Sequence, residues 1–264
     1  MGTYLDKILV RHRERAAGDT RSVDVWVEKV VAADDVNGPP RGFVESIRNA
    51  AGLAVIAEIK RRSPSKGDLK ANLDPAEVAT AYVEGDATCL SVLTDEDFFG
   101  GSKADLQSAR KAVPVPVLRK DFTVSPLDVV DARLMGADAI LLIVAALDQM
   151  QLRDFFDLAT ELGLDCLFET HDEAEVERAM DIGPTMVGVN QRDLTTFEVD
   201  TSRALRVCAS LDPSLVKVAE SGIKTPDDAG ELAAGGYDAV LVGESIVTSG
   251  DPTKAVAGLR EVGT

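Results

Sequence analysis

A pair of charged residues closes an apolar run of the sequence. Residues 55–60 begin with apolar, β-branched side chains, as a buried parallel strand does. Glu58 and Lys60 have the same parity, so both side chains project from one face of such a strand. Burying a carboxylate and an ammonium group costs free energy unless the two pair or take part in chemistry. The run therefore predicts either a buried ion pair beside a turn or one edge of a functional site.

Other apolar runs also end in side chains that can do chemistry. Lys120, Glu169 and Asn190 each stand at the last position of such a run. One polar residue there is often only a loop boundary, but two lysines, a carboxylate and an amide form a convergent set. Lys120 and Glu169 are the candidate acid/base pair. A lysine near a second cation, here Lys60, loses its proton closer to neutrality. Alternatively, Glu58 holds Lys60 charged for a substrate carboxylate or phosphate.

Asn190 and Arg192 are candidate ligands for other parts of a substrate. The amide of Asn190 offers both a donor and an acceptor to a sugar-like hydroxyl group. Arg192 could position an anion, although an ion pair with Asp193 or another acid is an equal alternative.

Small residues end two further runs and suit a bound phosphate. These runs close on Ser221-Gly222 and on Gly243-Glu244. Small residues leave backbone N–H groups open to an anion, and a short helix after the last strand would add its positive end. Each glycine alone could be an ordinary turn. We expect the Glu244 side chain to turn away from the phosphate while its N–H contributes.

The elements that must position these residues repeat along the chain. From residue 55 onward an apolar run is followed eight times by a helix-patterned stretch. The runs are 55–60, 88–94, 115–120, 139–144, 165–169, 186–190, 216–221 and 239–243. Strand–helix units without a hairpin signal predict a (β/α)8 TIM barrel, because a doubly wound sheet, the alternative, usually stops near about six strands. In such a barrel the polar strand ends would surround one cavity.

The residues before the first strand carry helical patterns over 3–17, 23–31 and 43–50. We expect residues 1–50 to form an N-terminal helical extension of a single barrel domain that covers residues 1–264.

The composition limits the partners and the location. A net charge of −17 repels nucleic acid and anionic membranes. No apolar run approaches the roughly 18 residues of a membrane span, and the start of the chain carries no signal peptide. The three cysteines have no metal-like spacing, and two histidines exclude a His-rich metal site. We expect a cytoplasmic protein with reduced thiols and no nucleic-acid or membrane partner.

Four motifs together resemble the indole-3-glycerol phosphate synthase family of tryptophan biosynthesis. They are Glu58-Ile59-Lys60-Arg61-Arg62-Ser63-Pro64-Ser65-Lys66-Gly67, Leu118-Arg119-Lys120-Asp121-Phe122, Asn190-Gln191-Arg192-Asp193-Leu194 and Ala219-Glu220-Ser221-Gly222. Their order and their strands match the family. The resemblance runs from about residue 3 to the end of the chain, and it includes an N-terminal extension that the family lays over the barrel mouth.

The resemblance implies a carboxy-lyase. Its reaction is ring closure of 1-(2-carboxyphenylamino)-1-deoxyribulose 5-phosphate with loss of carbon dioxide and water. The resemblance implies that Lys120 is the general acid at the ribulose carbonyl and that Glu169 assists the dehydration. It also implies that Lys60, held by Glu58, meets the anthranilate carboxylate. Asn190 is similar to the amide that orients the sugar hydroxyls.

The resemblance also assigns contacts to the phosphate and the aromatic ring. The residues placed where the family grips phosphate are Ser63, Ser221, Gly222, Gly243 and Glu244. Phe122 and Leu141 are similar to apolar residues that wall the ring, and Glu220 steers a lysine rather than touching substrate. No cofactor or metal is implied. The expected partner is this small molecule alone, bound by a monomer.

Residues 61–70 form a loop rich in lysine and glycine after the first strand. We predict that this loop moves over the substrate, with Lys66 as a mobile second cation. A plain solvated loop is the alternative.

Two other functions compete with the synthase. Another phosphosugar barrel, such as phosphoribosylanthranilate isomerase or the tryptophan synthase α chain, would share the phosphate end but lack the Glu-x-Lys strand with its Ser-Pro-Ser-Lys loop. A non-catalytic phosphosugar-binding barrel would keep the glycine strand ends without needing both Lys120 and Glu169.

Overall fold

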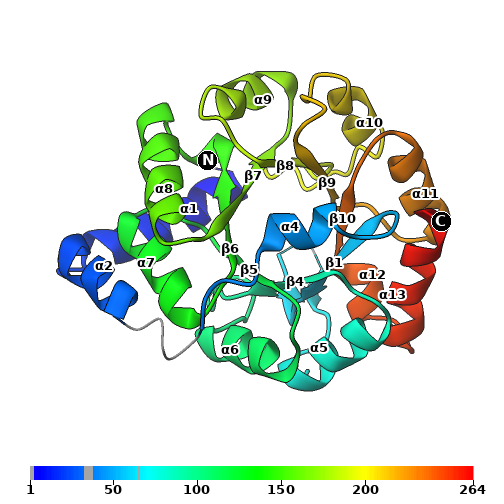
Figure 1. The fold of residues 1–264 in the computed structure, drawn as a ribbon, viewed down its shortest axis with the longest axis horizontal. Coiled ribbons are helices and arrows are strands. Elements are labelled where there is room, and N and C mark those ends of the chain that lie inside the picture. The colour runs from blue at the N-terminus through cyan, green and yellow to red at the C-terminus, as the bar shows by residue number, and fades with distance from the viewer. Residues whose placement is uncertain (1–2, 33–37, 65, 264) are drawn as a thin grey trace.

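Parallel strands close into a barrel inside a ring of helices (Figure 1). The computed structural model describes residues 3–32, 38–64 and 66–263, so parts of the predicted extension and Ser65 of the predicted loop lie outside the described residues. The barrel strands are β1 (Ala54–Ile59), β4 (Cys89–Leu93), β5 (Val117–Lys120), β6 (Ala139–Ile143), β7 (Asp165–Thr170), β8 (Met186–Asn190), β9 (Val216–Glu220) and β10 (Ala239–Val242). Each strand pairs with the next along the chain, and β10 pairs with β1. The predicted (β/α)8 barrel is confirmed, and the doubly wound alternative is wrong.

The outer helices begin where the sequence offers capping residues. Asp74 accepts the backbone N–H groups of Ala76 and Glu77, and Pro75 occupies the first turn, where its missing N–H costs nothing. The helices that follow the strands are α5 (Pro75–Glu84), α6 (Lys103–Ala112), α7 (Pro126–Met135), α8 (Gln149–Glu161), α9 (Glu173–Met180), α10 (Arg203–Cys208), α11 (Pro226–Ala234), α12 (Glu244–Val247) and α13 (Pro252–Arg260). Short 3-10 turns span Val144–Ala146 and Glu261–Gly263. In the described part of the chain, no helix is both long and apolar enough to cross a membrane.

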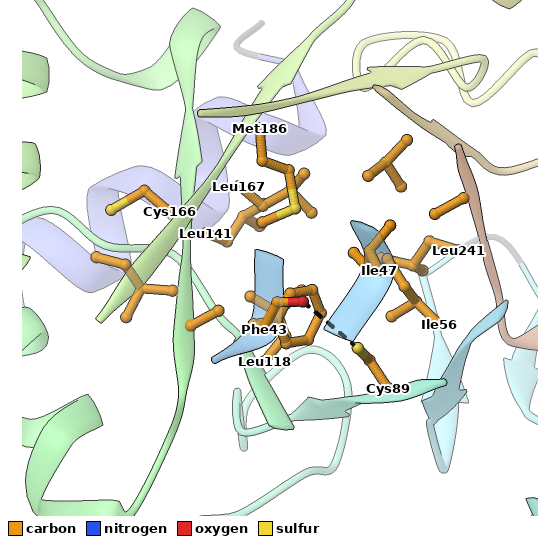
Figure 2. Packing of buried hydrophobic residues seen from close by; sticks show 14 of the residues in the cluster. Phe43, Ile47, Ile56, Cys89, Leu118, Leu141, Cys166, Leu167, Met186 and Leu241 are labelled. Carbon is orange, nitrogen blue, oxygen red and sulfur yellow. Dashed lines mark hydrogen bonds between the residues drawn. The ribbon is translucent and has the colours of Figure 1, made fainter. Parts of the chain in front are cut away.

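The predicted extension forms helices, and its last helix closes the amino-terminal end of the barrel. These helices are α1 (Tyr4–Ala17), α2 (Val23–Ala32) and α4 (Phe43–Arg48). Phe43 and Ile47 of α4 are buried against the apolar barrel interior, as Figure 2 shows. The Val44 N–H donates to the side chain of Asp165, the first residue of β7. The extension therefore seals the barrel floor, which the resemblance did not suggest.

Helix α1 lies at the opposite, carboxyl end of the strands. His12 of α1 is buried, and its Nε2 lies 2.9 Å from Asp95, two residues after β4 ends. Arg15 donates to Nδ1 of the same ring, so Nε2 carries the hydrogen and donates to Asp95. The ring also packs on Phe122 with 5.2 Å between centroids. The extension therefore contributes to the end of the barrel where the polar strand ends meet.

The loop after β1 contains a short hairpin that the sequence did not predict. Strands β2 (Arg62–Ser63) and β3 (Gly67–Asp68) pair antiparallel. The chain can turn back because Gly67 adopts a φ of +70°, a conformation that glycine reaches without strain. Arg61 fixes the base of the loop through an ion pair with Asp105 at 2.9 Å.

Candidate active site

A cavity of about 310 Å³ opens at the carboxyl ends of the strands. Every candidate residue from the sequence except Ser63 lines it: Glu58, Lys60, Lys120, Phe122, Leu141, Glu169, Asn190, Arg192, Glu220, Ser221, Gly222, Gly243 and Glu244. The Ser63 hydroxyl instead accepts the backbone N–H of Lys66 at 3.3 Å, within the loop. Barrel closure thus gathers residues that are up to 186 positions apart, from 58 to 244, around one space.

Lys120 at the end of β5 lies between two carboxylates. Its Nζ is 2.7 Å from Glu169 Oε2 on β7 and 3.0 Å from Glu220 Oε2 on β9. Burial lowers the pKa of Lys120, but the charges of Glu169, Glu220 and Glu58 outweigh burial and raise that pKa above its usual value. The prediction that Lys60 depresses the pKa of Lys120 is therefore wrong. Lys120 stays protonated, as a proton donor must before it acts.

The two carboxylates around Lys120 differ in their affinity for a proton. Burial raises the pKa of Glu169, but Lys120 and His171 outweigh it, so this pKa falls below the usual range. Burial raises the pKa of Glu220 to about 7, because its stabilisation by Lys120 is offset by the charges of Glu169 and Glu58. Neighbouring carboxylates with diverging pKa values are a frequent sign of acid/base chemistry.

Replacing Glu220 with glutamine should change how stability depends on pH. A folded-state pKa of about 7 lies above the unfolded value, so the folded protein holds this proton more tightly. Wild type should therefore lose stability relative to E220Q as the pH rises from about 4 to 7, by about 1 kcal/mol per pH unit at most. Urea unfolding at several pH values measures this difference. Exposed Glu231 on α11, also replaced by glutamine, is the matched control, and equal pH curves for the two variants would contradict the assignment.

Glu58 and Lys60 form an ion pair in this structure. Lys60 Nζ lies 2.6 Å from Glu58 Oε1, and Glu58 is 5% exposed. Gly243 makes room for this pair, because a Cβ at that position would lie 2.5 Å from Glu58 Oε1. The glycine that the sequence suggested for phosphate binding thus also accommodates a buried carboxylate.

The substitution Gly243→Ala should destabilise the protein by about 1–3 kcal/mol, the usual cost of forcing atoms into a packed site. The added methyl group must displace Glu58, and with it the contact to Lys60. Gly250→Ala is the control, because a Cβ there meets nothing within 4 Å. Urea unfolding compares the two variants, and equal midpoints would show that Glu58 relaxes freely.

Asn190 and Arg192 lie at the end of β8. The Asn190 side-chain oxygen accepts the Arg192 N–H at 3.0 Å, and its amide hydrogen-bonds with Glu169. The Arg192 guanidinium donates to the Phe197 carbonyl at 3.1 Å. The side chain of Asp193 accepts instead from the N–H groups of Thr195 and Thr196, so the alternative of an Arg192–Asp193 pair is wrong.

The backbone is unusual where β9 and β10 end at the cavity. Ser221 and Gly222 have φ values of +65° and +76°, and Gly243 precedes the short helix α12. Positive φ at a serine costs free energy, so such residues occur mainly where backbone geometry serves a purpose. The Glu244 carboxylate pairs with Lys66 of the loop after β1, and its orientation relative to a bound phosphate stays a prediction. Both residues line the cavity.

Sequence reasoning missed several residues at this end of the barrel. Phe99 and Phe197 add aromatic area to the cavity wall beside Phe122 and Leu141. His171 follows β7, and its Nε2 lies 3.7 Å from Glu169 Oε1. The spacing of His171 two residues after Glu169 was a usable signal, because both share a strand parity. Phe99 and Phe197 lie in loops, where sequence alone gives no direction for a side chain.

His12, Asp95 and Asp121 form a buried cluster with ligand atoms close enough for a metal ion. Hydrogen bonds already occupy both nitrogens of His12, and Asp121 accepts from Thr94 and Arg119. This arrangement fits a cluster that fixes α1 to the ends of β4 and β5, rather than a metal centre.

Comparison with known proteins identifies the family of this chain. A family model described as indole-3-glycerol phosphate synthase matches residues 5–259. The chain is 47% identical over 263 residues to the indole-3-glycerol phosphate synthase of Mycobacteroides abscessus, covering 100% of this chain and 96% of the relative. It is 53% identical over 224 residues to that of a Nocardioides species, covering 85% and 86%.

Similar solved structures have much lower identity and support the fold alone. 3-Hexulose-6-phosphate synthase from Salmonella typhimurium has a TM-score of 0.64 at 14% identity, covering 80% of this chain and 98% of that one. Thiamine phosphate pyrophosphorylase from Pyrococcus furiosus has a TM-score of 0.61 at 19% identity, covering 82% and 96%.

The closed barrel, with paired ionisable residues around a cavity at the carboxyl ends of its strands, has the architecture of a TIM-barrel enzyme. The chain belongs to the indole-3-glycerol phosphate synthase family. Membership makes it a carboxy-lyase of tryptophan biosynthesis, as the sequence motifs predicted.

Proposed function

We propose that this chain converts 1-(2-carboxyphenylamino)-1-deoxyribulose 5-phosphate into indole-3-glycerol phosphate, releasing carbon dioxide and water. The observation that carries the proposal is the contact of 2.7 Å between Lys120 and Glu169 on the wall of the cavity. Lys120 is the general acid that protonates the ribulose carbonyl oxygen as the ring closes. Glu169 then takes or returns a proton during the dehydration that restores aromaticity.

The neighbouring charged and polar residues orient Lys120 and bind other parts of the substrate. Glu220 accepts from Lys120 at 3.0 Å and so orients the lysine without meeting the substrate. Lys60 binds the anthranilate carboxylate, and Glu58 holds the lysine side chain in place through an ion pair of 2.6 Å. The amide of Asn190 orients the sugar hydroxyls.

The two ends of the substrate differ in chemistry, and so do the two sides of the cavity. Phe122 and Leu141 supply an apolar wall for the aromatic ring. The phosphate oxygens would accept hydrogen bonds from the backbone N–H groups of Ser221, Gly222, Gly243 and Glu244. Arg192, which lines the same cavity, would add a positive charge. Ser63 would join them only if the loop after β1 rearranges, since its hydroxyl lies off the cavity wall. The proposed ligand is this small molecule alone, bound by a monomer, and the net charge of −17 disfavours nucleic acid.

An assay of indole fluorescence tests the proposal directly. Wild-type protein given the carboxyphenylamino substrate should form a fluorescent indole product without any added cofactor. If no product forms while phosphoribosylanthranilate is isomerised, the chain is another phosphosugar barrel. If the substrate binds and neither reaction occurs, the chain is a binding protein and the proposal fails.

A further inference from the structure

His171 lies behind the proposed catalytic carboxylate, on the side away from Lys120. Glu169 presents Oε2 to Lys120 at 2.7 Å and Oε1 to His171 Nε2 at 3.7 Å. The carboxylate therefore stands between an ammonium group and an imidazole. The two neighbours of this histidine along the chain do not explain its position, because Thr170 bonds to the Gly188 carbonyl and Asp172 caps α9.

The hydrogen bonds of His171 fix which nitrogen carries a proton. Nδ1 lies 3.0 Å from Glu175 Oε2, which also accepts the backbone N–H of His171 at 2.9 Å. A carboxylate accepts only, so Nδ1 carries a hydrogen. Nε2 is buried and has no hydrogen-bond partner in the described structure. A neutral ring would turn the lone pair of Nε2 toward Glu169 Oε1, whereas a protonated ring turns a positively charged N–H toward it.

The charges around His171 favour the protonated ring. Burial lowers the pKa of His171, but the hydrogen bond to Glu175 and the charges of Glu169, Glu175 and Glu220 together raise it above the usual value. His171 also lines a second cavity of about 300 Å³, whose wall carries charged groups of both signs: Asp172, Asp193, Arg203 and Arg206.

We propose that His171 is a positioning residue that acts through Glu169: its imidazolium Nε2–H faces Glu169 Oε1 and keeps this carboxylate ionised when Lys120 turns to the substrate. This inference rests on the proposed roles of Lys120 and Glu169. Without a second cation, the departure or deprotonation of Lys120 would leave Glu169 buried beside Glu220 without a countercharge, and Glu169 would bind a proton too early to act in the dehydration. His171 does not line the substrate cavity, so it touches no reacting atom.

Histidine NMR tests the ion pair without any substrate. The chain has only two histidines, so spectra of H12N and H171N assign the signals of ¹⁵N-labelled protein. We expect both nitrogens of His171 to be protonated at pH 7 in wild type. In E169Q, the titration midpoint of His171 should fall by about one pH unit or more, because an opposite charge at this distance shifts a pKa by about 1–3 units. A neutral His171 at pH 7, or a midpoint that E169Q leaves unchanged, would overturn the inference.

The pH profile of kcat tests the effect on catalysis. H171Q places a neutral N–H near the position of Nε2, and H171N keeps a donor for Glu175 that cannot reach Glu169. Both remove the positive charge, so both should move the acidic limb of kcat upward by about one pH unit or more, with little change in KM. R206Q, which removes a half-exposed cation that has no contact with Glu169, should leave this limb in place.

The outcomes separate the inference from the proposed function. If wild type is inactive but the titration of His171 depends on Glu169 as expected, the proposed reaction is refuted and the ion pair is still established. An active wild type whose acidic limb is unchanged in H171Q and H171N refutes the role of His171 alone. Should either variant fail to fold, the E169Q titration still decides the coupling.

Discussion

Replacing Lys120 with methionine is expected to lower kcat by about 10²-fold or more. Methionine keeps nearly the length and volume of the side chain but has no proton to donate, whereas the proposed function requires Lys120 to protonate the ribulose carbonyl. A positioned general acid contributes roughly this much to a rate. KM should change far less, because the substitution leaves untouched the proposed substrate contacts of Lys60 and of the backbone N–H groups at Ser221, Gly222, Gly243 and Glu244. Indole fluorescence under saturating substrate measures the loss.

The same substitution should also destabilise the protein at neutral pH. It leaves Glu169 and Glu220, which are 2% and 1% exposed, without their shared cation. Removing one partner of a buried charge pair costs about 3–5 kcal/mol. The cost should shrink as the pH falls, because protonation removes the uncompensated charges.

Lys217→Met on β9 is the matched control. Lys217 belongs to the same barrel but does not line the cavity, so its loss should leave kcat unchanged. Turnover by K120M at more than about a tenth of the wild-type rate would mean that another group protonates the carbonyl. Circular dichroism of both variants confirms that the comparison is between folded proteins.

Local signals in the sequence were sufficient to predict the barrel. Each strand–helix unit carries its own apolar run and capping residues, such as Asp74 before Pro75, and these act over a few residues. The hairpin of β2 and β3 was not predicted, because each strand is only two residues long and the hairpin depends on the φ of Gly67. No periodicity can be read from two residues.

The wrong prediction for Lys120 has a different physical cause. Its position at the end of a strand could be read from the sequence, but its partners could not. Whether Lys60 or Glu169 lies beside it depends on side-chain direction across the barrel, which the closed sheet fixes. Lys60 is held by Glu58, two residues away, and this leaves Glu169 and Glu220 to surround Lys120. The direction in which a site shifts the pKa of a residue such as Lys120 therefore cannot be predicted without the tertiary structure.

The buried residue His12 shows the same limit for contacts between residues far apart in the sequence. His12 on α1 has its main partner, Asp95, 83 residues away. Its helical face was apparent from the sequence, but the surface that the helix covers was not. The same holds for α4, which closes the floor of the barrel with Phe43 and Ile47.

Replacing Glu169 with glutamine is expected to separate the two halves of the reaction. The glutamine side chain keeps the shape and a hydrogen-bond acceptor for Lys120 but cannot take up a proton. Lys120 retains Glu220 as a countercharge at 3.0 Å, so its proposed protonation of the carbonyl is preserved in this variant. Indole formation should fall by about 10²-fold or more, the usual contribution of an acid/base group.

Carbon dioxide release distinguishes this role from a general loss of activity. If Glu169 acts only in the dehydration, ring closure and decarboxylation still proceed in E169Q. A single turnover with substrate labelled in the carboxylate should then release labelled carbon dioxide well before the indole fluorescence appears. In wild type the two signals should rise together, unless the dehydration already limits the rate. Equal loss of both signals in E169Q would instead place Glu169 in ring closure, as the residue that holds Lys120 in position through their contact of 2.7 Å.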